Sequence, residues 1–588
     1  MKRFTHRFRI LSRPRSQYIG YLLCLWLLQA HGSTHAQGSD NNAKNPLVLA
    51  QHPDAIRAGY MVLERGGTAA DAAVAIQAML GLVEPQSSGP GGGSLLLYWD
   101  AKQHRLHALD GLAMAPGKVS EDLLLDFDGS RISIESASRG GRSAGVPGTM
   151  PLLEVMHRRW GRLQWSTLFD HAIERAQEGF NASVYLESVL RQSRSAGPSY
   201  AIDQVFSFDL RAGDRLTNHE YAHTLRQFAQ QGYQGWLMQG GAETMIYALK
   251  GQGIESQLNR SDFITYKVIE RNPLCSMIFS VTICSFPSPS FGGLAVLQTL
   301  KILDALELHS PLSWNFLDER FVHQYIEAAR LATADRRQWL GDPDFVKDFS
   351  DDLLAQAYVQ ERAAIIGSRA LEKVQPGLPS HLKVGILDGE RANDALAHGA
   401  TSHFTVIDVE GNMVVITTTI NLNFGSRVGA GGFFINNMMS NFTSNLQEAP
   451  FYAVEARKVN KQAGAANSVD SHKRAYTSMA PLIVFDSQHQ PIAAFGAAGG
   501  GPIVDFLAKS LIGFLKSKKS SQELVAEANL SASTGTPVFE AGRWPKDILT
   551  SLQHRGHKLR EAPLLSGKVI VIKSDKTWAG AADPRRLP

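Results

Sequence analysis

The chain has 588 residues, of which 44% are hydrophobic and 19% charged, and its formal net charge is +4. This is ordinary globular usage, and it excludes a disordered chain, a collagen-like chain and a bundle of membrane helices. Six of the cations lie in residues 1–36, which contain no Asp or Glu, so the rest of the chain is close to neutral. We therefore expect no basic surface for nucleic acid.

The first 36 residues have the pattern of an export signal. A basic stretch ending at Arg15 leads into a mostly apolar run of about 13 residues, from Tyr18 to Ala30. Such a run is too short to span a hydrocarbon core of about 30 Å. Thr34-His35-Ala36 then offers small residues at the two positions that a signal peptidase reads. We expect residues 1–36 to be a signal peptide and the protein to be exported, periplasmic or secreted; an uncleaved membrane anchor is the alternative.

Periodicity predicts a helix over residues 54–64 and a second helix that begins after Thr68, its N-cap, and ends near Val83. A glycine-rich turn, 85–93, precedes a predicted strand over 94–99. No Lys-Ser or Lys-Thr follows these glycines, which excludes a phosphate-binding loop. We interpret them as a place where two backbones approach closely.

The middle of the chain is predicted to be helical, and residues 366–399 read as an exposed connector. Strand-like runs dominate after this connector. Helices between two strand-rich parts predict sheets that are covered by helices. The predicted helices of the middle part are 152–159, 165–178 and 291–308, and the predicted strands of the last part are 401–408, 413–420, 432–436, 481–485 and 491–496.

Two cysteines follow the predicted signal, Cys275 and Cys284, and they bracket a strand-like segment, 276–283. In an exported chain this spacing favours one local disulfide, with two buried free thiols as the alternative. No Cys/His spacing indicates zinc, and we predict neither a metal nor a cofactor.

The runs 401–408 and 413–420 form a predicted hairpin whose turn is Glu410-Gly-Asn412. A turn centred near residue 410 or 411 places Thr401 opposite Thr419 or Ile420. Thr401 is thus a hydroxyl at the start of a strand, just after a flexible connector, which suits a cut that exposes an N-terminal Thr. Because Thr is also common in strands, these residues alone leave a purely structural role open.

Short motifs along the whole chain carry a resemblance to one family. They are Gly66-Gly-Thr-Ala-Ala-Asp-Ala-Ala73, Glu84-Pro-Gln-Ser-Ser-Gly-Pro-Gly-Gly-Gly93, Gly145-Val-Pro-Gly148, Pro287-Ser-Pro-Ser-Phe-Gly-Gly293, Thr401-Ser-His-Phe-Thr405, Thr417-Thr-Thr-Ile-Asn421, Asn436-Asn437, Thr477-Ser-Met-Ala-Pro481, Gly499-Gly500 and Ala582-Asp-Pro-Arg585. With these motifs the chain resembles the γ-glutamyltranspeptidase family of N-terminal nucleophile hydrolases over about residues 45–585. The resemblance implies an α/β fold of the α+β type, a four-layer αββα sandwich.

The resemblance also implies self-cleavage between Ala400 and Thr401, which gives a large subunit, 37–400, and a small catalytic subunit, 401–588, held together as a heterodimer. The implied substrate is a small γ-glutamyl or related amide, and the acceptor is water or an amine. The implied roles are Thr401 as nucleophile, Thr419 as its orienting partner, Gly499 and Gly500 as oxyanion donors, and Asn421, Thr477 and Ser478 as residues of the acyl pocket.

Three positions depart from the family pattern. Leu112 stands where the family has an Arg that grips the α-carboxylate of the γ-glutamyl group, and Met438 and Asn441 stand where it has acceptors for the α-amino group. Losing one partner of a buried charged pair typically costs about 2–5 kcal/mol, so glutathione is predicted to be a poor substrate. Arg427 is the nearest cation in sequence that could compensate, and we interpret it as a solvated loop residue.

Three hypotheses follow. The first is a γ-glutamyl hydrolase or transferase that acts on glutathione-like peptides. The second is an amidase or acylase with the same fold and nucleophile but another acyl group, which the three departures favour. The third is a self-processing but non-catalytic binding protein.

Overall fold

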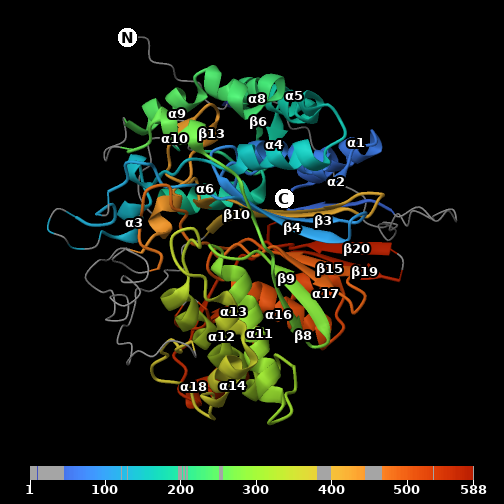
Figure 1. The fold of residues 1–588 in the computed structure, drawn as a ribbon, viewed down its shortest axis with the longest axis vertical. Coiled ribbons are helices and arrows are strands. Elements are labelled where there is room, and N and C mark those ends of the chain that lie inside the picture. Colours follow the sequence, from blue (N-terminus) through green and yellow to red (C-terminus); the bar gives the residue numbers. More distant parts are fainter. Residues whose placement is uncertain are drawn as a thin grey trace, which may run out of the picture.

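The structure is a computed structural model, and Figure 1 shows its fold. Within the part of the chain that it describes, no helix is both long and apolar enough to cross a membrane. The predicted signal peptide, apart from residues 9–10, and most of the predicted connector lie outside the described residues. Those residues are 9–10 and 45–586, without 121, 127, 129, 131, 196–201, 203–205, 207–208, 251–255, 380–398, 444–465, 534 and 576.

Two six-stranded antiparallel sheets stack at the centre of the molecule. The first has the strand order β2-β10-β11-β3-β4-β7, and the second has the order β20-β19-β15-β14-β9-β8. The strands of the first sheet are β2 (Leu47–Ala50), β3 (Gly93–Asp100), β4 (Arg105–Gly111), β7 (Ile269–Arg271), β10 (Gly399–Ile407) and β11 (Met413–Leu422). Those of the second are β8 (Leu274–Ile278), β9 (Val281–Ser285), β14 (Leu482–Phe485), β15 (Pro491–Gly496), β19 (Val569–Ser574) and β20 (Thr577–Ala582).

A layer of helices covers the outer face of each sheet, which gives the predicted αββα sandwich (Figure 1). The first layer contains α1 (Pro53–Glu64), α2 (Ala69–Val83), α4 (Thr149–Trp160), α5 (Asp170–Glu178), α6 (Val184–Ser195), α8 (His219–Met238), α9 (Gly241–Lys250) and α10 (Arg260–Thr265). The second contains α11 (Phe291–Glu307), α12 (Glu319–Trp339), α13 (Ser350–Leu354), α14 (Gln356–Ala364), α16 (Ile503–Leu515), α17 (Ser521–Ala526) and α18 (Lys546–His554).

Shorter elements complete the fold. They are the strands β1 (Arg9–Ile10), β5 (Phe180–Asn181), β6 (Arg215–Thr217), β12 (Gly429–Ala430), β13 (Phe433–Phe434), β16 (Leu530–Ser531), β17 (Val538–Glu540) and β18 (Arg560–Ala562), together with the helical turns α3 (Ile134–Ala137), η1 (Gly141–Ser143), η2 (Trp165–Leu168) and η3 (Met438–Asn441).

Strand β3 illustrates how the layers bury the central sheets. Successive side chains of a strand point to opposite faces. Leu95 and Leu97 therefore join Ile483 of β14 in the core between the sheets, whereas Leu96 and Tyr98 pack against the first helical layer. Since both faces are covered, every residue of β3 is buried. Because both faces of the sheet are buried, such strands read as continuous apolar runs in the sequence.

Several predicted elements are confirmed. The N-cap of α2 is Thr68, and its side chain and that of Asp71 form a reciprocal capping box before the helix runs to Val83. The predicted helices 54–64, 152–159 and 291–308 correspond to α1, α4 and α11, and the predicted strand 491–496 is β15.

Two predictions need correction. The predicted helix 165–178 is divided into η2 and α5 at Phe169, because Trp165 donates its indole N–H to the carbonyl of Phe228 and packs edge-on against Phe169, which holds the first turn against α8. The predicted strand 432–436 contains only the two residues of β13, since the N–H of Asn436 leaves the ladder and donates to the carbonyl of Gly91.

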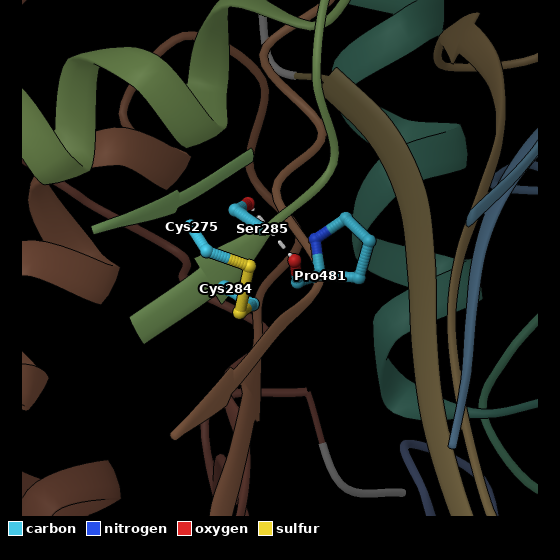
Figure 2. The surroundings of a disulfide bond; sticks show 4 residues. All are labelled: Cys275, Cys284, Ser285 and Pro481. Carbon is cyan, nitrogen blue, oxygen red and sulfur yellow. Dashed lines mark hydrogen bonds between the residues drawn. A yellow bond between two sulfur atoms is a disulfide. The ribbon is translucent and has the colours of Figure 1, made fainter. Parts of the chain in front are cut away.

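The predicted strand between the cysteines is a hairpin, β8 and β9, at the edge of the second sheet. It turns at Phe279 and Ser280, whose φ angles are +52° and +67°. Cys275 and Cys284 lie directly opposite each other, and their sulfur atoms are bonded (Figure 2). The hydroxyl of the adjacent Ser285 donates to the carbonyl of Pro481 at 2.9 Å, which fixes the hairpin to the start of β14.

Mass spectrometry of unreduced peptides should find Cys275 linked to Cys284. Replacing both with Ser should lower the midpoint of thermal unfolding by a few degrees. The bond closes a loop of about ten residues, and this removes about 2–3 kcal/mol of entropy from the unfolded chain. Alkylation of both thiols in native, unreduced protein would contradict the linkage.

Candidate active site

The centre of the first sheet carries the residues of the predicted hairpin. The register of β10 and β11 places Thr401 opposite Thr419, one of the two partners that the turn predicted. Both threonines are almost completely buried. Their hydroxyl oxygens lie 3.1 Å apart. Strand β10 begins at Gly399, so it runs without a break through the bond between Ala400 and Thr401.

The ladder between the two strands is interrupted next to this threonine pair. The following pair joins Ala400 to Asn421, so Ile420 has no partner across the ladder. The N–H of Ile420 instead donates to the carbonyl of Ser87 at 3.1 Å. Such a bulge re-aims side chains and frees backbone groups from the sheet. The interruption therefore leaves backbone and side-chain polar groups free to gather at the peptide bond between Ala400 and Thr401.

The hydroxyl of Thr419 occupies the centre of this arrangement. It accepts the backbone N–H of Asn421 at 2.8 Å and makes a short hydrogen bond to the carbonyl of Ala400. A hydroxyl has one proton, which here goes to the Ala400 carbonyl, so the remaining lone pair must accept from Thr401. The proton of Thr401 is thereby directed towards Thr419, and the carbonyl of Ala400 is polarised.

The two glycines with the implied oxyanion role lie against Gly399, the residue that precedes Ala400. Gly499 and Gly500 connect β15 to α16 with φ angles of +133° and +71°, which favour glycine. A Cβ atom on Gly399 would overlap the backbone of Gly500, so these two backbones are in contact. The hydroxyl of Ser478 donates to the Gly500 carbonyl at 2.8 Å. The neighbouring Thr477 is tied to α11, because its carbonyl accepts the N–H of Phe291 at 2.9 Å.

The glycine-rich turn supports the threonine pair from the other side. A Cβ atom on Gly92 would overlap the carbonyl of Thr419, and one on Gly91 would overlap the carbonyl of Phe434. This confirms the interpretation of the run as a close approach of backbones. A larger residue at position 92 would push against the backbone of β11 at Thr419, and one at position 91 would push against Phe434 of β13.

Asn421 joins the threonine pair to the turn η3. Its side-chain amide donates to the carbonyl of Asn437 at 3.1 Å and to the hydroxyl of Ser440 at 3.2 Å. It therefore lies against η3, the turn that carries Met438 and Asn441. Met438 is buried, whereas Asn441 is partly exposed and accepts a hydrogen bond through its carbonyl.

Leu112 is held rigidly in an apolar cluster that also contains Met438. Its side chain is fully buried, its N–H donates to the carboxylate of Asp110 at 3.0 Å, and its carbonyl accepts the hydroxyl of Tyr266 at 2.7 Å. The structure thus brings together two of the three departures from the family pattern. Both side chains lie in the same apolar surroundings.

A buried ionic cluster lies directly behind Leu112. The carboxylate of Asp110 pairs with Arg271 at 2.8 Å and with Arg474 at 2.9 Å, and Asp342 also contacts Arg271, at 3.3 Å. Burial alone would raise the pKa of Asp110, but the two guanidinium groups outweigh it and hold this pKa below its usual range. Both arginines are thus already paired to carboxylates. Sequence reasoning missed this cluster, because its members are far apart along the chain.

Arg427 is not the solvated loop residue that the sequence suggested. It has a φ of +61°, it is only partly exposed, and its Nη1 atom is buried without a hydrogen-bond partner among the described residues. Burial and the nearby Arg139 lower its pKa, against the opposing effect of Glu135. We conclude that the guanidinium of Arg427 is partly buried in the protein and is not fully solvated.

Two ionisable groups on or against β10, His403 and Glu84, are poor candidates for a base that acts on Thr401. His403 is fully buried, shares a 2.8 Å hydrogen bond with Thr417, and burial lowers its pKa to about 3, so it stays neutral. Glu84 accepts the hydroxyl of Ser402 at 2.6 Å, and burial raises its pKa. Within the described part of the chain, no imidazole or carboxylate is hydrogen-bonded to the Thr401 hydroxyl.

Comparisons with known proteins agree on the family. Residues 55–587 match the gamma-glutamyltranspeptidase family. The glutathione hydrolase proenzyme of Pseudomonas aeruginosa is 32% identical over 565 residues, which cover 92% of this chain and 93% of that protein. The acylase ACY 1 proenzyme of Pseudomonas sp. (strain V22) is 29% identical, with 91% of each chain covered. Cephalosporin acylase from Bacillus halodurans shares the fold, with a TM-score of 0.77 at 22% identity over 95% of this chain and 98% of that one.

Proposed function

Since the chain belongs to the gamma-glutamyltranspeptidase family, we propose that it is a self-processing enzyme that cleaves amide bonds through an acyl-enzyme on Thr401. The observation that carries this proposal is the hydrogen-bonded pair of Thr401 and Thr419 beside the polarised carbonyl of Ala400. We further propose that residues 1–36 direct export to the periplasm or the medium. The larger and smaller products of processing are then 37–400 and 401–588.

Self-processing begins at the bond between Ala400 and Thr401. The hydroxyl oxygen of Thr401 attacks the carbonyl carbon of Ala400, and its proton passes through Thr419 to the carbonyl oxygen. The tetrahedral intermediate collapses with cleavage of the C–N bond, and the nitrogen takes up the proton. The product is an ester between Ala400 and the Thr401 side chain. Water then hydrolyses this ester, which leaves a carboxylate on Ala400 and a free hydroxyl and amine on Thr401.

The new amine supplies the base that the intact chain lacks. It accepts the proton of the Thr401 hydroxyl, which attacks the carbonyl of a substrate amide. Backbone N–H groups at Gly499 and Gly500 stabilise the oxyanion, and one such donor is typically worth about 3–4 kcal/mol. The leaving amine takes the proton, and water or a second amine then accepts the acyl group.

The uncut chain is expected to be inactive towards other amides. The backbone before Thr401 lies against Gly500, where the carbonyl oxygen of a substrate has to bind. Cleavage must therefore be followed by movement of residues 399–400 away from the two glycines. This supports processing as the step that opens the site.

Two kinds of acyl group are candidates for the substrate. Asn421, Thr477 and Ser478 match the pocket for a γ-glutamyl group, and we propose γ-glutamyl amides as substrates. A second candidate, an acylase with a less charged acyl group, is favoured by the burial of Leu112 and Met438 in one apolar cluster. The similarity to an acylase proenzyme is consistent with this candidate.

Purified protein should consist of two chains, and N-terminal sequencing of the smaller one should begin Thr-Ser-His-Phe. Thr401→Ala should remain a single chain, because no hydroxyl is left to attack Ala400. Denaturing gels of both proteins measure this directly. A wild-type protein that stays intact under conditions in which it is folded would exclude the proposed mechanism.

Replacing Thr419 with the isosteric Val should slow self-cleavage by at least about a hundredfold, because the hydroxyl that polarises the Ala400 carbonyl is lost. Thr419→Ser should retain most of the rate. Thr418→Val is the matched control: it also removes one buried hydroxyl, but that hydroxyl bonds to Ser94 instead. Equal rates for the Val variants at 418 and 419 would argue against a specific role of Thr419.

Anilides of γ-glutamate, glutarate and butyrate form a series that loses the α-amino group and then the carboxylate. Wild type should use the γ-glutamyl anilide weakly, mainly through a raised KM. Leu112→Arg with Asn441→Asp should raise kcat/KM for it by at least about tenfold, equivalent to about 1.4 kcal/mol. The control variant, Leu112→Met with Asn441→Asp, has the same carboxylate but no guanidinium, so it should show a smaller gain in kcat/KM. Micromolar KM for glutathione in wild type, with no gain in the double variant, would show that other residues hold the glutamyl group.

A further inference from the structure

The C-terminal end of the described chain reaches the nucleophile. The Nη1 atom of Arg586 donates to the backbone carbonyl of Thr401 at 2.9 Å. The Arg586 side chain is buried, and its guanidinium lies 4.6 Å from the centre of the Tyr185 ring in α6. Residue 586 thus contacts a residue 185 positions earlier.

Ser402, which follows the proposed nucleophile, is bound by a residue from the N-terminal part of the described chain. The hydroxyl of Ser402 donates to the carboxylate of Glu84, which follows α2. The charges of Arg586 and Glu84 act on each other, since the guanidinium opposes the rise in the pKa of Glu84 that burial causes. Thr401 and Ser402, the first two residues of the proposed small subunit, therefore have different partners. Arg586 of the same subunit binds Thr401, and Glu84 of the proposed large subunit binds Ser402.

Arg586 differs from its neighbour Arg585 in what it binds. Arg585 pairs with the carboxylates of Glu540 and Asp583, as a structural arginine does. The hydrogen bonds of Arg586 go to backbone carbonyls, those of Thr401 and Leu565. Burying a cation without a hydrogen-bonded carboxylate is costly, and an apolar side chain would fill the same space more cheaply. Packing alone therefore does not account for the charge and the donors of Arg586.

We propose that Arg586 is a positioning residue for the nucleophile, and that self-cleavage waits until the C-terminal segment has docked. This proposal rests on the proposed function. A hydrogen bond to the carbonyl of Thr401 restricts rotation of the backbone beside its side chain. It thereby keeps the hydroxyl between Thr419 and the carbonyl of Ala400, and small errors in such alignment are costly in rate. Residue 586 is synthesised after Thr401, so a chain that has not yet been extended to residue 586 cannot cut itself.

The test compares full-length Arg586→Met and Arg586→Lys with wild type. Met keeps the length of the side chain over Tyr185 but removes its charge and donors, whereas Lys keeps a charge and a donor. Arg586→Met should slow self-cleavage by at least tenfold, and Arg586→Lys should restore most of the rate. In the cut proteins, kcat for a chosen amide should follow the same order while KM changes less than twofold. Arg555→Met is the matched control. It removes a partly exposed ion pair with Glu319 and should cleave normally.

Chemical rescue separates positioning from folding. Millimolar guanidinium should accelerate cleavage of Arg586→Ala by several-fold and leave wild type unchanged. Circular dichroism and thermal unfolding show whether each variant is folded. Cleavage of folded Arg586→Met at the wild-type rate would overturn this inference alone. Equal slowing of the Met and Lys variants without rescue would assign Arg586 to folding and also overturn it, and a wild type that never cuts would overturn the proposed function as well.

Discussion

The candidate site depends on one missing pair in the ladder between β10 and β11. Because Ile420 has no partner, the backbone N–H of Asn421 turns towards the hydroxyl of Thr419 instead of crossing to the neighbouring strand. That hydroxyl then faces both Thr401 and the carbonyl of Ala400. In a regular ladder the same residues would be unremarkable members of a buried strand. The bulge thus gathers two hydroxyls and a backbone carbonyl at one point of a buried strand without any ionisable side chain.

Local signals in the sequence predicted much of the fold. Thr68 and Asp71 specify the start of α2 through a capping box, and the turn at Glu410–Asn412 fixes the register that brings Thr401 to Thr419. The hairpin at Cys275 and Cys284 escaped prediction, because it turns at Phe279 and Ser280, and neither residue is typical of positive φ. The resemblance to a family supplied the layered architecture and the roles of the site residues, which periodicity alone does not give.

Contacts between distant segments could not be predicted in this way. The pairing of Asp110 with Arg271 and Arg474, and the contact of Arg586 with Thr401, join residues that no local pattern relates. The ionic cluster holds the backbone around Leu112, because the N–H of Leu112 donates to the carboxylate of Asp110 and this contact does not involve the side chain at position 112.

The strand order has a further consequence for the two proposed subunits. In the first sheet, β10 and β11 lie between β2 and β3, so the first strands of the small subunit are hydrogen-bonded on both sides to strands of the large one. In the second sheet, β14 is paired to β9 in the same manner. The fragments cannot part without dismantling both sheets. Dilution should therefore not dissociate them, and a cut molecule would keep the cooperativity of a single folding unit while gaining a second pair of chain ends.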